Sequence, residues 1–148
     1  MVEQKEHEAL TPWICQISRL SSLFVAREMS HLGFGTGQFF FLTELYQNEG
    51  LSQDELSDRV GVDKSNTSRV LAKLEKYGFI RRETDPKNHR VKKIFLESKA
   101  DEIREALQRI QRRWNTELLD GLSEKKKAEL LLNLKKIAHN AAFFSREN

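Results

Sequence analysis

Apolar residues recur every three or four positions along most of this chain, which predicts a mainly helical protein. The first helix is expected over 12–32, because Thr11 and Pro12 together form a typical helix start. Its apolar stripe consists of Ile14, Ile17, Leu20, Phe24 and Leu32. A second helix is expected between a Thr36 cap and Gly50, with the stripe Phe39, Leu42, Leu45 and Tyr46.

Two further helices follow closely, and both have clear end signals. Ser52 and Glu55 have the spacing of a capping box, and Gly61 ends the short helix that they start. Asp63 then caps a helix that runs to the residue before Gly78. A short helix, a tight turn containing glycine and a second helix predict a helix-turn-helix unit.

The apolar pattern changes to a period of two after this unit. The segments 79–83 and 91–96 are rich in β-branched and aromatic residues, and the connection between them, 84–90, is rich in turn formers. We therefore expect a β-hairpin, which makes the unit a winged helix. Its tip carries three basic side chains, Lys87, His89 and Arg90.

Two long helices are expected at the C-terminal end, over 98–120 and 123–143, with Ser98 and Ser123 at their starts. Both carry an apolar seam at nearly heptad spacing, which is typical of helix pairing. A winged-helix core of ~60 residues cannot cover these seams, so a symmetric second copy is expected to do so. The predicted homodimer interface consists of Ile103, Leu107, Ile110, Leu130, Leu134 and Ile137.

The predicted fold class is mainly α with a small β-hairpin wing. A winged helix-turn-helix is expected to be flanked by long N- and C-terminal dimerisation helices. The N-terminal helix and its flank occupy 1–33, the DNA-binding domain 34–97, and the C-terminal dimerisation helices 98–148.

Charge is distributed unevenly along the chain. Residues 1–51 contain three Lys or Arg and six Asp or Glu, whereas residues 60–95 contain ten Lys or Arg and four Asp or Glu. A concentrated positive region indicates a polyanionic partner, although a solvated charged face is an equally good explanation of composition alone.

The helix after Asp63 resolves this ambiguity in favour of double-stranded DNA. Its outer face is expected to carry Lys64, Ser65, Asn66, Ser68, Arg69 and Lys73. Asn and Arg bind the edges of adenine and guanine, and the N-terminal half of a recognition helix enters the major groove. The basic wing is expected to contact the DNA backbone or the minor groove, and Gln53 to contact a phosphate.

The sequence contains few motifs that would indicate another class of function. There is no phosphate-binding glycine loop, nucleophile elbow or pair of carboxylates with a histidine, so no enzyme, cofactor or metal site is predicted. A signal peptide and a membrane-spanning segment are also missing, which predicts a cytoplasmic protein. The alternative is a winged helix that binds RNA or another protein, for which an apolar or aromatic outer face would be expected.

The segment "LSQDELSDRVGVDKSNTSRVLAKLEKYGFIRRETDPKNHRVKKIFL" resembles the MarR family of bacterial and archaeal transcriptional regulators, and the resemblance extends over about 10–143. Asp85 and Arg90 match the wing pattern of that family, whereas Lys87 and Asn88 replace the usual Arg and Asp. The resemblance implies a homodimeric transcriptional regulator, most often a repressor. It also implies that a ligand or an oxidant lowers its affinity for DNA.

The same resemblance suggests a pocket for a small aromatic ligand between the flanking helices and the winged helix. By position it would involve Trp13, Ile17, Phe24, His31, Phe34, Phe39 and Trp114, although a place in the core is the better explanation for most of these aromatic residues. The single cysteine, Cys15, is near a helix start and is the candidate for a redox-responsive alternative.

Overall fold

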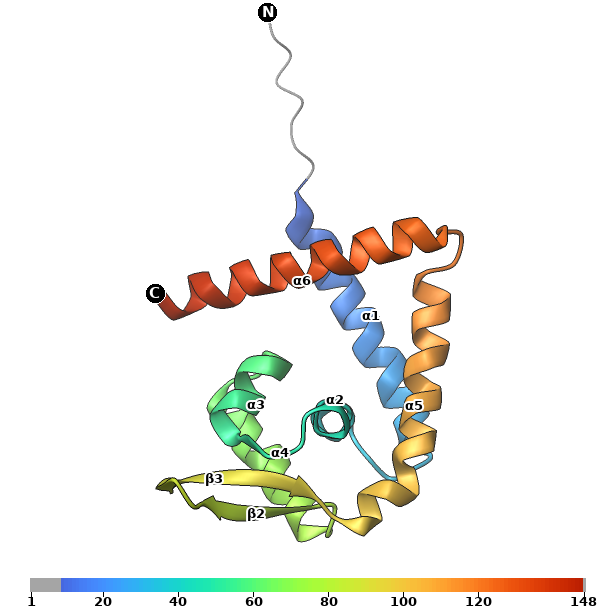
Figure 1. Ribbon diagram of the computed structural model, residues 1–148. Helices are drawn as coiled ribbons and strands as arrows, with labels where there is room; N and C mark the ends of the chain where they lie inside the picture. The colour runs from blue at the N-terminus through green and yellow to red at the C-terminus, as the bar shows by residue number, and fades with distance from the viewer. Residues whose placement is uncertain (1–8, 148) are drawn as a thin grey trace, which may run out of the picture.

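The computed structural model describes residues 9–147. In chain order the elements are α1 (Leu10–Ser30), α2 (Thr36–Gln47), β1 (Leu51–Ser52), α3 (Gln53–Val60), α4 (Lys64–Lys76), β2 (Ile80–Asp85), β3 (Asn88–Leu96), α5 (Ser98–Leu118) and α6 (Glu124–Glu147) (Figure 1). The strands form an antiparallel sheet in the order β1-β3-β2. This confirms the predicted fold class. The first eight residues and Asn148, which fall within the predicted segments 1–33 and 98–148, lie outside the described residues.

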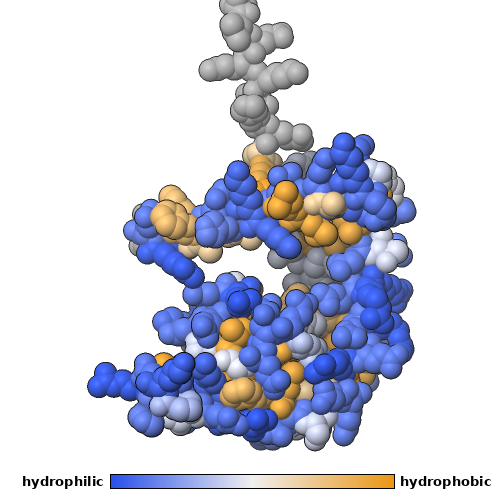
Figure 2. Space-filling model, viewed as in Figure 1, coloured by the Kyte–Doolittle hydropathy of each residue, from blue (hydrophilic) through white to orange (hydrophobic). Residues whose placement is uncertain are grey.

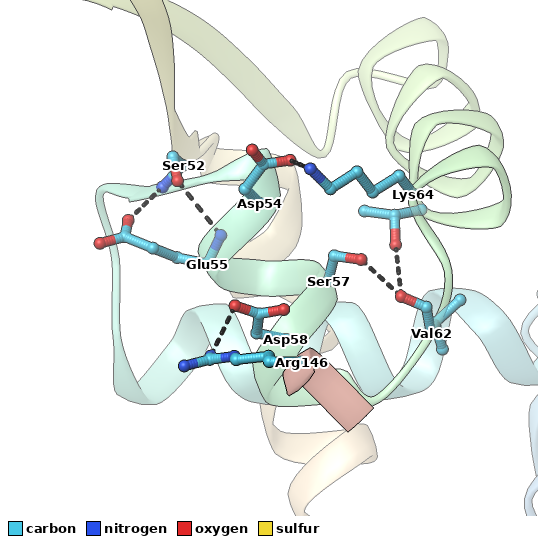
Figure 3. A network of polar contacts seen from close by, with 9 residues as sticks. Ser52, Asp54, Glu55, Ser57, Asp58, Val62, Lys64 and Arg146 are labelled. Carbon is cyan, nitrogen blue, oxygen red and sulfur yellow. Dashed lines mark hydrogen bonds and ion pairs between the residues drawn. The ribbon is translucent and has the colours of Figure 1, made fainter. Parts of the chain in front are cut away.

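Local end signals define α3 and α4 as predicted. Ser52 Oγ accepts a hydrogen bond from the Glu55 N–H (3.2 Å), and Glu55 Oε2 accepts one from the Ser52 N–H (2.7 Å) (Figure 3). Gly61 ends α3 with φ of 73°, a conformation that glycine adopts without strain. At the start of α4, Asp63 Oδ1 accepts from the Asn66 N–H (2.9 Å).

Three other helix starts differ from the prediction by one or two residues. The residue before the helix is Ala9 instead of Thr11 in α1, Gly35 instead of Thr36 in α2, and Glu97 instead of Ser98 in α5. In α2 the cap comes from within the helix, because Gln38 Oε1 accepts from the Gly35 N–H (3.0 Å). Thr11, Thr36 and Ser98 thus lie inside the first turn of their helices instead of preceding it.

The wing is longer and less regular than predicted. Its strands approach within two residues of each other at the tip, whereas a longer connection was expected. Thr84 is paired with Lys92, but the next residue, Asp85, is paired with Asn88. Residues 89–91 therefore have no register partner on β2 and form an irregular, bulged part of β3.

The core lies where α1, α2, α3, α4, the sheet and α5 meet. Its largest fully buried apolar residues are Phe41, Met29, Leu42, Leu45, Leu56, Leu71, Leu74, Ile80, Ile94 and Leu107. Leu107 is 0% exposed, Ile110 is 8% exposed, and Ile103 packs against the same cluster. The apolar stripe of α5 is thus covered by α1 and α2 of the same chain, which leaves little of Leu107 and Ile110 for a second copy to contact, and the predicted dimer interface stays a prediction.

The C-terminal half of α1 meets α5 at an angle on one side of the molecule (Figure 1). Trp114 Nε1 donates to Ser21 Oγ (2.8 Å), and the Trp114 ring stacks on Phe24 with 4.6 Å between ring centroids. Arg113 Nη1 lies 3.2 Å from Glu28 Oε1 on the same pair of helices. Hydrogen bonding, stacking and charge thus fix α1 to α5.

Helix α6 crosses above the winged helix, and its C-terminal end lies over α3 (Figure 1). The contact there includes an ion pair between Arg146 Nη2 and Asp58 Oδ2 (2.9 Å) (Figure 3). Large apolar side chains remain exposed on α1 (Leu10, Trp13, Ile14, Ile17, Leu20, Leu23) and on α6 (Leu130, Leu131, Leu132, Leu134, Phe143, Phe144). Figure 2 shows hydrophobic surface along α6, whereas the wing tip is hydrophilic.

Candidate nucleic-acid interface

Helix α4 presents a polar face to solvent. The exposed side chains of this face are Lys64, Ser65, Asn66, Ser68, Arg69 and Lys73. On the opposite face Thr67, Leu71 and Leu74 are buried. Thr67 Oγ1 donates to the Val62 carbonyl (3.4 Å), so the one hydroxyl on this inner face has a partner. The face predicted to meet DNA is therefore accessible.

A chain of hydrogen bonds runs along the first turns of this exposed face. The two carboxylate oxygens of Asp63 accept from the backbone N–H and from the side-chain Nδ2 of Asn66. Asn66 Oδ1 in turn accepts from Arg69 Nη2 (2.6 Å). The hydrogen bonds from Asn66, the backbone one first, hold the pKa of Asp63 below its ordinary value. Asp63 is consequently a carboxylate at neutral pH.

The start of α3 lies between the recognition helix and the wing. On one side, Asp54 Oδ1 is 3.3 Å from Lys64 Nζ at the start of α4 (Figure 3). On the other side, Gln53 Oε1 accepts from Arg82 Nη1 of β2 (3.4 Å). The amide Nε2 of Gln53 remains a donor toward a phosphate. These contacts join α4, α3 and the wing into one continuous surface.

A groove of about 330 Å³ opens between the start of α3 and the wing, and its lining contains three basic side chains and one acidic one, Asp54. Arg82, Arg90 and Lys92 line it together with Gln53. Arg82 is held in place, because its Nε lies 3.3 Å from Glu75 Oε2 on α4. Arg90 and Lys92 are exposed. Three cations beside a helix N-terminus suit a phosphate group.

The wing tip is ordered by its own side chains. Asp85 Oδ1 accepts from the Lys87 N–H (2.9 Å), and Asn88 Oδ1 accepts from the Arg90 N–H (3.2 Å). The ion-pair partner of Asp85 is Lys93 Nζ (3.8 Å) rather than Arg90. Within residues 9–147, the Arg90 guanidinium has no ion-pair partner. It is thus available to an external anion.

The structure brings the residues predicted for DNA together on α3, α4 and the wing, and their contact with DNA stays a prediction. Sequence reasoning missed two members of the groove, Arg82 and Lys92. Their charge was visible within the basic segment. Only the pairing of β2 with β3, and the contact of both with α3, shows that they lie beside Gln53.

The predicted ligand pocket does not form as one site in this chain. Phe39 is 4% exposed and belongs to the core, and Phe24 and Trp114 stack on each other. Three other members of the predicted set are exposed: Trp13, Ile17 and His31. Most of these aromatic side chains therefore already have partners within the chain, or lie outside any enclosed space.

Phe34, the remaining residue of that set, lines a different cavity of about 400 Å³. The cavity lies between the α1–α2 connection, the end of α4 and the start of α5. Phe34 meets Phe79 edge-on with 4.8 Å between ring centroids. Lys99 Nζ donates to the Tyr77 carbonyl (2.8 Å) and lies 4.7 Å from the centre of the Phe79 ring. A second cation, Lys73, enters from the polar face of α4.

Other kinds of site have little support in residues 9–147. Cys15 is exposed on α1. Over the described range, no group of three His, Cys, Asp or Glu side chains is arranged to hold a metal ion. None of the helices in this range is both long enough and apolar enough to cross a membrane.

Comparison with known proteins points to one family. Residues 36–92 match the model of the MarR family. The uncharacterized HTH-type transcriptional regulator YybA of Bacillus subtilis (strain 168) is 28% identical over 113 residues, which cover 76% of this chain and 75% of that protein.

Solved structures agree with this match. A MarR transcriptional regulator from Methanosarcina mazei Go1 superimposes with a TM-score of 0.81 at 27% identity, over 91% of this chain and 97% of that one. A putative MarR family transcriptional regulator from Listeria monocytogenes, complexed with 26mer DNA, gives a TM-score of 0.86 at 27% identity, over 91% of this chain and 90% of that one. The chain therefore carries a MarR-family domain over residues 36–92, within the fold of MarR-family transcriptional regulators.

Proposed function

We propose that this protein is a sequence-specific, double-stranded DNA-binding transcriptional regulator that acts as a repressor. One observation carries the proposal: the polar face of α4, the start of α3 and the basic wing form one continuous surface. Lys64 with Asp54 joins the first two elements, and Arg82 with Gln53 joins the last two. In such a surface α4 reads base edges in the major groove while α3 and the wing hold phosphates.

The chemistry of this surface favours DNA over a protein or RNA partner. The outer face of α4 consists of Ser, Asn, Arg and Lys side chains, and Tyr77 lies only at its C-terminal end. A protein-docking face would be apolar, and single-stranded RNA is bound by stacking on aromatic rings. No catalytic step is required of any residue in this function.

The regulator is proposed to act as a homodimer. Twelve large apolar side chains on α1 and α6 are exposed in the single chain, among them Trp13 (51%) and Leu134 (43%), and clustered exposed apolar residues are typical of an interaction surface. A second copy would cover it symmetrically, with 9–33 and 98–147 as the dimerisation part and 34–97 as the DNA-binding part. The operator is then expected to be pseudo-palindromic, with half-sites about 10 bp apart.

Selection of bound duplexes from a random pool tests this proposal directly. We expect a pseudo-palindromic motif to be enriched. Affinity for that motif should fall by roughly three to five orders of magnitude between ~50 and ~200 mM salt, as for proteins with several phosphate contacts. A pool without an enriched motif, or an affinity that does not depend on salt, would contradict the proposal.

We also propose that a small organic anion lowers the affinity for DNA. The cavity of about 400 Å³ has the size of a ligand site and combines aromatic walls with two ammonium groups. Lys73 belongs both to this cavity and to the polar face of α4. An anion that engages Lys73 would remove one cation from the surface offered to phosphates.

Benzoate and benzamide are a matched pair of probes, because only the first carries a charge. We expect benzoate, and not benzamide, to weaken binding of the selected duplex. The effect should be lost in Lys99→Met, because this substitution removes the second ammonium group of the cavity while leaving the residues on the polar face of α4 in place; it also removes the hydrogen bond to the Tyr77 carbonyl at the end of α4, so binding without benzoate is compared with the wild type first. Equal effects of both probes, or an unchanged benzoate effect in the variant, would rule out this cavity as the anion site.

A further inference from the structure

The donor-to-acceptor direction of the hydrogen bonds that link Asp63, Asn66 and Arg69 is fixed by the two charged groups at the ends. A carboxylate only accepts hydrogen bonds and a guanidinium only donates them. The amide of Asn66, which lies between the two, must therefore turn its Nδ2 toward Asp63 and its Oδ1 toward Arg69. The reversed amide would place two acceptors together at one end and two donors together at the other.

We propose that Asn66 is a positioning residue for Arg69, and that Arg69 reads a guanine. The inference rests on the proposed DNA-binding function. Direct recognition of adenine would require both amide groups of Asn66 to face the base, whereas they face Asp63 and Arg69. Arg69 uses one N–H of Nη2 for Asn66, and its other donors remain for the N7 and O6 acceptors of guanine.

The backbone anchors this arrangement to the helix. Asp63 is the N-cap of α4, and its Oδ1 accepts the Asn66 N–H (2.9 Å). The carboxylate that orients the amide is therefore held by the first turn itself. Arg69 has a long side chain with many rotamers, and a partner that holds it before binding reduces the entropy lost on binding DNA.

A set of four variants tests the role of Asn66: Asn66→Ala, Arg69→Ala, the double variant of both, and the charge-neutral swap Asp63→Asn with Asn66→Asp. Affinity is measured for the selected duplex and for duplexes in which each base pair of a half-site is replaced. Gln108→Ala, an exposed amide residue on α5, is the matched control and should behave as the wild type.

We expect Arg69→Ala to remove discrimination of about 10- to 100-fold at one guanine position. Asn66→Ala should reduce discrimination at that same position, and the double variant should be no worse than Arg69→Ala. The swap should keep the guanine preference. The new carboxylate at position 66 accepts a hydrogen bond from Arg69 and a second one from the new amide at position 63. Asparagine is also a good N-cap, so α4 keeps its start.

Two results would overturn the inference. In one, Asn66→Ala or the swap removes a preference for adenine at a different position and leaves the guanine preference intact, which would mean that Asn66 reads a base. In the other, Asn66→Ala changes nothing, or weakens all duplexes equally together with a lower Tm, which would mean that its role is only structural. A wild-type protein that prefers no duplex would instead refute the proposed function.

Discussion

Arg69 and Arg90 lie on the same surface but are held differently, so their loss should have different effects. Arg69 Nη2 is bound to Asn66 Oδ1 (2.6 Å) on the recognition helix. Arg90 is anchored through its backbone N–H to Asn88 Oδ1 (3.2 Å) on the bulged wing, and its guanidinium is exposed. Base contacts determine sequence preference, whereas phosphate contacts determine affinity and its dependence on salt.

Arg90→Ala should weaken binding to all duplexes to a similar extent, because a cation that faces a phosphate or the minor groove does not distinguish individual bases. The slope of log affinity against log salt should become less steep by about 1. Fluorescence anisotropy over a salt series measures both quantities. Arg109→Ala is the control, since Arg109 pairs with Glu105 on the exposed side of α5. A change of sequence preference in Arg90→Ala, at constant slope, would contradict this role.

Tyr46 links α2 to the first turn of α5, and its environment has a consequence for stability at alkaline pH. The hydroxyl donates to the Ala100 carbonyl (2.6 Å), and burial raises the pKa of Tyr46 from 10.0 to about 12. The guanidinium of Arg104, 4.7 Å from the ring centre, opposes part of this rise. The protonated phenol is therefore favoured by folding.

Tyr46→Phe should lower the free energy of unfolding by about 1 kcal/mol near pH 8, because the Ala100 carbonyl loses its donor. The pKa of Tyr46 is higher in the folded state than in the unfolded state, so the extra stability of the wild type is complete below about pH 10. It should decline as the pH rises from about 10 toward 12, where the unfolded state loses the proton first. Urea unfolding of both proteins at several pH values measures the difference. The chosen limit is about pH 11.5, ~0.5 below the pKa of Tyr46 in the folded state. If the difference in unfolding free energy between the two proteins stayed constant up to that pH, the raised pKa of Tyr46 would be contradicted.

Ser52 and Ser98 both have the sequence context of an N-cap, but only one of them caps a helix. Ser52 Oγ accepts from the Glu55 N–H (3.2 Å), and the Ser52 N–H donates in return to the Glu55 carboxylate (2.7 Å), which lowers the pKa of Glu55. Ser98 is the first residue inside α5, and the preceding Glu97 makes no side-chain cap bond.

Ser52→Ala should therefore lower the free energy of unfolding by about 1 kcal/mol, whereas Ser98→Ala should change it by less than about 0.5 kcal/mol. Thermal or urea unfolding of the two variants provides the measurement, with each serine serving as the control for the other. Equal destabilisation would mean that Ser98 contributes to a cap as the sequence alone predicted.

The elements that were predicted correctly are those whose signals are local in sequence. Asp63 and Gly61 act on backbone groups within four residues, so their roles follow from spacing alone. The start of α2 is set by an equally local bond between the Gly35 N–H and Gln38, and the prediction chose the wrong one of two adjacent residues with similar preference for the cap position. The bulge at 89–91 depends on how β3 pairs with β2, which no local pattern encodes.

In the candidate site, too, only the parts that depend on local sequence could be predicted. The exposed face of α4 follows from helical periodicity, because Thr67, Leu71 and Leu74 define the buried side. The groove between α3 and the wing follows from tertiary contacts, so Arg82 and Lys92 could not be assigned to it from the sequence. The contacts of Phe24 with Trp114 likewise follow from packing, so the sequence could not show which of the aromatic residues have partners within the chain.

At the scale of the whole molecule, α5 and α6 show that similar apolar seams can have different partners. Both helices were predicted to face a second copy. Leu107 of α5 is 0% exposed and is covered by its own chain, whereas Leu134 of α6 is 43% exposed. Periodicity identifies which face of a helix is apolar, but only the fold determines whether that face is used within the chain or between chains.

Leu134→Asp should therefore disrupt dimerisation, whereas Leu107→Asp should disrupt folding of the single chain. A carboxylate at position 134 lies at the surface of the single chain, so the protein should keep its helical circular dichroism and its Tm within a few degrees, but sediment as a monomer. A carboxylate at position 107 would be buried without a partner, which costs roughly 3 kcal/mol or more and should leave no cooperatively folded protein. Sedimentation equilibrium with thermal unfolding separates the two outcomes. A dimeric Leu134→Asp would refute the α6 interface, and a folded, monomeric Leu107→Asp would restore the interface that the sequence predicted for α5.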